Sequence, residues 1–162
     1  MITSVQCYKK WGDPLTTFDE GSYMTLWRVP EYVWKHIPTI PRRIYCNEQM
    51  IIPLEVAFLD VINQGLTDKI VTWDGCFQVR PIRGYAHIFK RFMNRGQFEA
   101  AMRYLSIHSW GCAIDINQAT NGLGKVPTMS KDLVKCFKDA GFDWGGEWKR
   151  PDGMHFQLTY LT

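Results

Sequence analysis

The segment that decides the fold is Ser106-Ile-His-Ser-Trp-Gly-Cys-Ala-Ile-Asp-Ile-Asn117. Its second half alternates as an extended strand does, with apolar side chains on one face and mostly polar ones on the other: Cys112, Ile114 and Ile116 against Ala113, Asp115 and Asn117. A carboxylate placed among buried isoleucines is costly unless a cation or hydrogen bonds satisfy it. We therefore expect a strand over residues 112–117 that presents Asp115 to a polar site.

A second segment, Asp152-Gly-Met-His155, leads into another alternating run that ends at Leu161. In this run Phe156 anchors one face, and the imidazole of His155 points to the other. The pattern predicts a strand over residues 155–161. Two neighbouring strands would then present Asp115 and His155 side by side on the same surface.

His108 precedes Asp115 by seven positions, and seven residues of extended chain span roughly 23 Å. The chain must therefore fold back between the two residues, and Gly111 is placed to allow this reversal. Two imidazole nitrogens and one carboxylate oxygen would then surround a single point. This ligand set suits Zn²⁺ with a fourth position open for water, as catalytic zinc sites require.

Asp152 lies three positions before His155, near enough to reach a water on the metal without being a ligand. Zinc lowers the pKa of that water to about 7, and a nearby carboxylate can take its proton during attack on a carbonyl group. An arginine would stabilise the oxyanion or hold a substrate carboxylate, and Arg80 and Arg83 are the candidates. Either spacing alone can arise by chance. Both occur here, and each leads into an apolar strand, so together they favour a catalytic metal site.

Other residues with possible chemistry lack this context. His36 and His87 are expected to face solvent, and Cys112 is expected in the core because its strand parity matches that of Ile114. Trp144 and Trp148 flank a glycine pair, and the sequence favours a cleft and a core position equally for them.

The length and composition are typical of one ordinary globular domain. The chain has 162 residues, 46% of them hydrophobic, and a formal net charge of +3, so it can bury a core without disulfides. Its five scattered cysteines form no C-x-x-C pair, which indicates reduced thiols. The modest charge, without a basic run, argues against nucleic-acid binding. The sequence begins without a signal-peptide pattern and contains no apolar run of about 18 residues, so no membrane anchor is expected.

The element pattern is α+β. Helices are expected from Pro53 to Gly65, where Val56, Leu59, Val61 and Ile62 recur at helical spacing, over residues 86–104 with an interruption near 94–96, and over 131–140. A strand with a turn at Asp74-Gly75 is expected over residues 69–79. Residues 1–50 should wrap the core as short strands and loops. We expect a single domain, 1–162, in which helices flank a small, mostly antiparallel sheet.

The two segments resemble the zinc peptidases that cut peptidoglycan peptides: the D-Ala-D-Ala carboxypeptidases, the vancomycin-resistance dipeptidases and the phage L-alanyl-D-glutamate endolysins. The family pattern S-x-H-x-x-G-x-A-x-D, followed by acidic-x-x-H, is met in full. Its positions are Ser106, His108, Gly111, Ala113, Asp115, Asp152 and His155. The similarity extends over about 70–160, the expected catalytic core.

This resemblance implies Zn²⁺ bound by His108, Asp115 and His155, Asp152 as catalytic base, and a fold shared with the hedgehog signalling domain. Arg80, which is followed by proline, fits the upstream arginine of the family, with Arg83 as its competitor. Ser106 and Trp148 are expected to contact substrate.

The implied function is hydrolysis of peptide bonds in peptidoglycan stem peptides, most simply by a monomeric phage endolysin of the L-alanyl-D-glutamate type. Such an enzyme would accumulate in the host cytoplasm and reach the wall after a holin opens the membrane. The alternatives are a D-Ala-D-Ala carboxypeptidase and a zinc-containing wall-binding module that does not hydrolyse.

Overall fold

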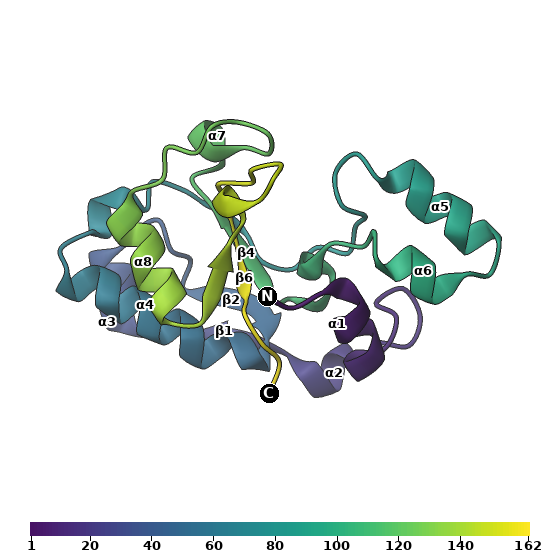
Figure 1. Cartoon of the computed structure of the whole chain (residues 1–162). Coiled ribbons are helices and arrows are strands. Elements are labelled where there is room, and N and C mark those ends of the chain that lie inside the picture. The colour runs from purple at the N-terminus through teal and green to yellow at the C-terminus, as the bar shows by residue number, and fades with distance from the viewer.

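Two antiparallel sheets organise the computed structural model, which describes residues 1–162. The larger sheet has four strands in the order β3-β4-β6-β5, and the smaller pairs β1 with β2. Helices pack around both sheets (Figure 1). The predicted α+β class, with a small antiparallel sheet flanked by helices, is confirmed.

The four-stranded sheet positions the site. Its strands are β3 (Trp73–Gly75), β4 (Ala113–Ile116), β6 (His155–Leu158) and β5 (Phe142–Trp144). In the antiparallel pair β4–β6, Asp115 lies directly opposite His155, so their side chains leave the sheet on the same face. The two strands predicted from alternation are therefore neighbours, and both are buried along their whole length. β6 ends at Leu158, earlier than the predicted residue 161.

Two helices cover the other face of this sheet. They are α4 (Ile51–Asn63) and α8 (Lys131–Asp139), which lie beside each other in Figure 1. Aromatic rings join them to the sheet: the ring of Phe137 lies 6.1 Å from that of Phe58 and 4.7 Å from that of Phe156. Helix α8 begins as predicted, because the Ser130 hydroxyl accepts a hydrogen bond from the Leu133 amide.

The apolar stripe predicted for α4 is partly wrong. Val61 is fully buried, but Val56 and Leu59 are 48% and 44% exposed. The buried face consists of Leu54, Ala57, Phe58 and Val61. The helix is apolar on nearly all sides, and spacing alone does not say which stripe of such a helix faces the core.

The first fifty residues contain more regular structure than expected. They form α1 (Ser4–Trp11), α2 (Glu20–Tyr23), β1 (Met24–Arg28), α3 (Glu31–His36) and β2 (Arg43–Asn47), followed by a short 3₁₀ turn, Glu48–Met50. The three helices are absent from the sequence prediction because each has only one or two turns. At that length, contacts with the rest of the chain decide the conformation.

The strand predicted over residues 69–79 is also shorter than expected, because only Trp73–Gly75 pairs with β4. Before it, Thr67–Lys69 form a 3₁₀ turn, and the Asn117 side chain accepts hydrogen bonds from the amides of Val71 and Thr72. A side chain thus satisfies backbone groups that a strand partner would otherwise bind.

The predicted interruption near residues 94–96 is confirmed. Two helices, α5 (Ala86–Asn94) and α6 (Phe98–Met102), form an arm on the side of the molecule away from α4 and α8 (Figure 1). The remaining short elements are the 3₁₀ turns Ile107–Trp110 (η3) and Gly145–Glu147 (η4) and the helix α7 (Gln118–Asn121). None of the helices has the length and hydropathy needed to cross a membrane.

Candidate metal centre

The reversal that brings His108 to Asp115 occurs at Gly111, as predicted. His108 lies in η3, and Gly111 ends this turn with φ of +66° before β4 begins. A side chain here would also collide with its surroundings, since a Cβ atom would lie 2.7 Å from the backbone nitrogen of Asn47. Glycine is therefore required at this position both by backbone conformation and by space.

His108, Asp115 and His155 meet at one point. Nε2 of His108 and Nδ1 of His155 each lie 3.1 Å from Oδ1 of Asp115, and the two nitrogens are 3.1 Å apart. All three side chains are buried, and their ligand atoms are close enough together to hold a metal ion. The structure thus brings together all three predicted ligands, from η3, β4 and β6.

A hydrogen bond on the outer side of the His108 ring determines which of its nitrogens faces this point. Its Nδ1 lies 2.5 Å from the backbone oxygen of Cys76, which can only accept a hydrogen bond, so Nδ1 carries the proton. The lone pair of Nε2 then points toward Asp115 and His155. A nitrogen lone pair directed at a buried carboxylate requires a cation between them, and two nitrogens with one oxygen suit zinc.

Electrostatics at the triad also favour a cation. Burial raises the pKa of Asp115, but the neighbouring His108 and His155 rings outweigh it and hold this pKa well below its usual range. Burial lowers the pKa of His155, and the Asp115 carboxylate more than compensates, so this pKa is raised overall. Asp115 therefore keeps its negative charge in the interior, and this charge would balance that of a bound cation.

Asp152 stands beside the triad without belonging to it. Burial is the largest cause of its raised pKa, and the nearby Asp115 carboxylate acts in the same direction. Its Oδ1 is buried and has no hydrogen-bond partner in the protein. An unpartnered carboxylate oxygen of this kind is available to a small polar molecule in the adjoining cavity.

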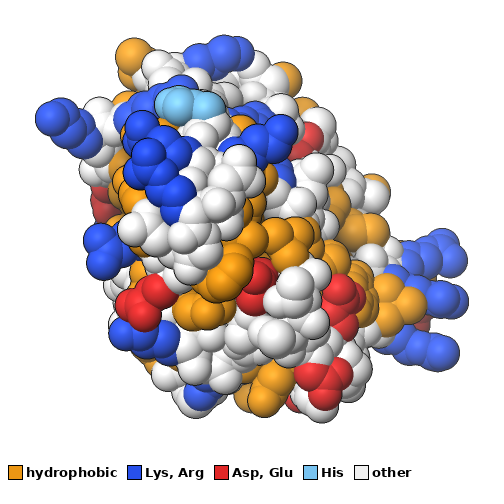
Figure 2. Space-filling model, turned by 90° about the vertical axis from the view of Figure 1, so that its right-hand side faces the viewer, with side chains coloured by type: hydrophobic (Ala, Val, Ile, Leu, Met, Phe, Trp, Pro, Cys, Tyr) orange, Lys and Arg blue, Asp and Glu red, His pale blue; other side chains and the backbone are white.

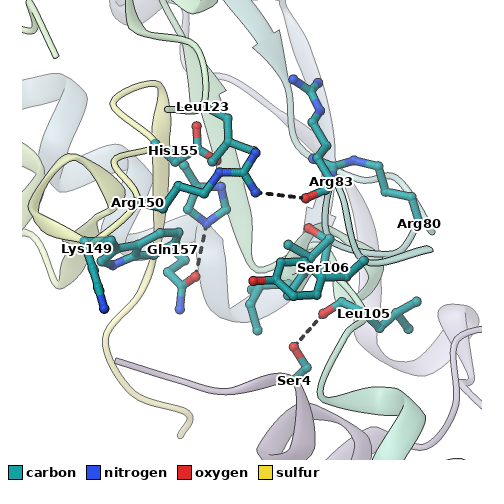
Figure 3. A pocket seen from close by; sticks show the side chains of 15 residues that line it. Ser4, Arg80, Arg83, Leu105, Ser106, Leu123, Lys149, Arg150, His155 and Gln157 are labelled. Carbon is teal, nitrogen blue, oxygen red and sulfur yellow. Dashed lines mark hydrogen bonds between the residues drawn. The ribbon is translucent and has the colours of Figure 1, made fainter. Parts of the chain in front are cut away.

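This cavity has a volume of about 350 Å³ and opens next to His155 (Figure 3). It is lined by basic side chains and by a single carboxylate, that of Asp152. The basic residues are Arg80, Arg83, Lys149 and Arg150. His108 and Asp115 lie behind the lining, so the metal position forms the inner end of the cavity.

Both candidate arginines line this cavity. The guanidinium of Arg80 donates hydrogen bonds to Oε1 of Gln78 and to the backbone oxygen of Pro81. Burial lowers the pKa of Arg80, while Asp115 and Asp152 act against this change, which places Arg80 in the field of both carboxylates. Arg83 lowers the pKa of Asp152. Neither arginine donates a hydrogen bond to Asp152, and the geometry keeps both as candidates.

Ser106 and Trp148 also line the cavity, and the ring of Trp148 lies 5.2 Å from that of His155. Trp144 instead packs against the core and donates a hydrogen bond to the backbone oxygen of Gly153. The structure thus assigns the cleft to one tryptophan and the core to the other. Cys112 is fully buried in the core, as predicted.

Several residues of the cavity were not among those predicted from the sequence. Lys149 and Arg150 are an adjacent basic pair just before Pro151 and Asp152, and this proximity was a usable signal. Gln157 shares the strand face of His155, so alternation could have identified it. No local pattern in the sequence brings Ser4 to the cavity, because that contact depends on the packing of α1.

Comparison with known proteins agrees with this geometry. Residues 99–158 match the family described as D-alanyl-D-alanine carboxypeptidase, and the matched range contains the three triad residues and Asp152. The searches of curated proteins and of solved structures gave no match.

The fold, the buried His-Asp-His triad and this match define a zinc metallopeptidase. More specifically, residues 99–158 are similar to the family described as D-alanyl-D-alanine carboxypeptidase.

Proposed function

We propose that the chain hydrolyses peptide bonds in peptidoglycan stem peptides, with zinc held by His108, Asp115 and His155 and with Asp152 as the base. The observation that carries this proposal is the juxtaposition of the buried triad with Asp152, which has one unpartnered oxygen and lines the same cavity as His155. The family match supports a peptide with a D-Ala-D-Ala end as substrate class.

When bound, zinc supplies a Lewis acid and lowers the pKa of a coordinated water. Asp152 then takes a proton at Oδ1 from the attacking water and returns it to the leaving amine. Its raised pKa suits this task, because a stronger base holds the proton better between the two steps. Arg80 or Arg83 stabilises the negative charge that develops on the carbonyl oxygen.

The charge of the cavity supports an acidic substrate. Four basic side chains surround one carboxylate, and the basic character continues along the chain. Residues 75–98 contain no Asp or Glu but several basic residues: Arg80, Arg83, Lys90, Arg91 and Arg95. Figure 2, which looks onto the side that carries α5 and α6, shows Lys and Arg side chains gathered around a histidine. Such a surface attracts an anionic polymer.

The number of cations in the cavity supports a choice between the possible bonds. A terminal D-Ala-D-Ala bond needs a partner for one C-terminal carboxylate, and one arginine provides it. The cavity offers more cations than this, which favours an interior bond with carboxylates nearby, such as L-Ala–D-Glu. We therefore propose an endopeptidase of the phage endolysin type, with the D-Ala-D-Ala carboxypeptidase as alternative.

The test combines purified peptidoglycan with mass spectrometry of the released fragments. Asp152→Asn should lower the rate by about 10²- to 10⁴-fold while zinc still binds, and a chelator should abolish activity until zinc is restored. Asp139→Asn, which changes an exposed carboxylate on α8, is the matched control and should keep full activity. A new N-terminal D-Glu identifies the endopeptidase, and release of D-Ala identifies the carboxypeptidase.

Full activity of the metal-free protein or of Asp152→Asn would contradict the proposed mechanism. One equivalent of bound zinc without cleavage of any fragment would support the non-hydrolytic wall-binding module instead.

A further inference from the structure

The two histidines of the triad are held from behind by different groups. Nδ1 of His108 faces the backbone oxygen of Cys76, whereas Nε2 of His155 faces Oε1 of the Gln157 side chain at 3.1 Å (Figure 3). A backbone oxygen can only accept a hydrogen bond, but a glutamine amide has an accepting and a donating end. Gln157 alone would therefore leave open which nitrogen of His155 carries the proton.

The Ile2 carbonyl group decides this question. It accepts a hydrogen bond of 2.9 Å from Nε2 of Gln157, so the donating end of the amide is directed at Ile2 and the accepting end at His155. Gln157 is only 3% exposed, and water cannot compensate for a flip. A flipped amide would place two oxygens together at Ile2, at a cost of about 1–3 kcal/mol for each unsatisfied group.

The position of Ile2 is itself fixed. Its amide donates to the backbone oxygen of Leu158 at 3.4 Å, and two residues later the Ser4 hydroxyl donates to the backbone oxygen of Leu105 at 2.6 Å. The first residues of the chain thus run along β6, and the Ile2 oxygen lies within reach of Gln157.

We propose that Gln157 is a positioning residue for His155. The Ile2 carbonyl group orients the Gln157 amide, and the amide in turn makes Nδ1 the metal-binding nitrogen of His155. Gln157 accepts the Nε2 proton of His155, and the lone pair of Nδ1 is left facing Asp115 and His108. His108 and His155 then bind through different ring nitrogens, each determined by a backbone carbonyl group, directly in one case and through an amide in the other.

This inference rests on the zinc site of the proposed function, and its measurement is zinc affinity rather than catalysis. Loss of a group that orients a ligand typically weakens metal binding by 10- to 100-fold. Gln157→Leu keeps the approximate volume but removes the acceptor, so we expect its zinc Kd to rise by about 10- to 100-fold. Gln157→Glu keeps an acceptor and has no donating end, so its zinc Kd should stay within about threefold of wild type.

Gln49→Leu is the matched control. The Gln49 amide also donates to a backbone oxygen and accepts from a backbone amide, both of Thr162, and it lies outside the metal centre. The full-length variants are compared by zinc titration against a competing chelator, and their thermal stability is measured without metal. A purely structural role of Gln157 predicts that zinc affinity follows stability, with Gln157→Glu as weak as Gln157→Leu, and this result would overturn the proposal.

Nitrogen NMR of the zinc-loaded wild type gives a test that needs no variant. The expected spectrum has the His155 proton on Nε2, protected from exchange with solvent, and the metal on Nδ1. Zinc on Nε2 would overturn the proposal. A wild type that binds zinc in this way but cleaves no peptide would leave the proposal standing and would refute only the proposed function.

Discussion

Two carboxylates of one site experience opposite environments. Two imidazole nitrogens lie 3.1 Å from Oδ1 of Asp115, and they hold its pKa low in spite of burial. Asp152 is partly buried without such neighbours at its Oδ1 atom, and its pKa is raised. Two carboxylates separated in this way are suited to different tasks: a permanent anion binds the metal, and a stronger base moves protons. A difference in surroundings, rather than in residue type, thus separates the candidate metal ligand Asp115 from the proposed base Asp152.

The cysteine side chains give a prediction at the same scale. All five are free and at most 8% exposed, and burial raises the pKa of Cys7 and Cys46 to about 12. The thiolate is the reactive form, so raising the pH from 7 to 9 should not start labelling of the folded protein. In denaturant, where the ordinary pKa is about 8.5, five thiols should react with Ellman's reagent, faster at higher pH. A rapidly reacting thiol in the folded protein would contradict this burial.

At the scale of elements, the turn between η3 and β4 determines whether the ligands meet. Gly111→Ala should destabilise the protein by more than about 3 kcal/mol, because a side chain at φ of +66° is strained and its Cβ would also collide with Asn47 and Met24. Gly96 has nearly the same φ, +67°, but open space around it. Gly96→Ala should therefore cost only about 1–2 kcal/mol.

Urea denaturation of both variants separates the strain from the collision. Equal losses of stability would show that space at Gly111 is unimportant. Zinc affinity should fall for Gly111→Ala and remain unchanged for Gly96→Ala, whose position between α5 and α6 is remote from the triad.

The predicted and observed elements can be compared one by one. β4, β6 and α8 were predictable because alternation or a helical stripe with an N-cap is contained within each segment. The beginning of β3 was not, since the side chain of Asn117, distant in the sequence, replaces a strand partner for Val71 and Thr72. For the site, spacing and parity were sufficient for the triad and Asp152. The basic wall and the Ile2–Gln157 contact depend on how distant segments pack.

At the scale of the whole molecule, the metal centre joins three elements, η3, β4 and β6, from two distant segments of the chain. Because the triad exists only in the folded state, bound zinc should stabilise the protein by about 4 kcal/mol at a free zinc concentration about 1,000 times Kd. For a chain of this length we expect a rise in Tm of about 10 °C. Scanning calorimetry with and without a chelator measures this effect.

Asp115→Asn is the control for this measurement, since it removes the charge at nearly constant shape. Its Tm should not respond to zinc in the same concentration range. A zinc-dependent rise as large as that of the wild type would mean that the stabilising metal is bound elsewhere.

The strand order also affects how the enzyme is made. β6 follows all the other strands in the sequence but lies in the middle of the sheet, between β4 and β5. During synthesis, β4 and β5 therefore lack their common partner strand until β6 has left the ribosome. Until then the metal centre also lacks His155. A chain interrupted before this strand has neither a continuous sheet nor a complete site, so we expect no partly active fragments to arise from incomplete translation.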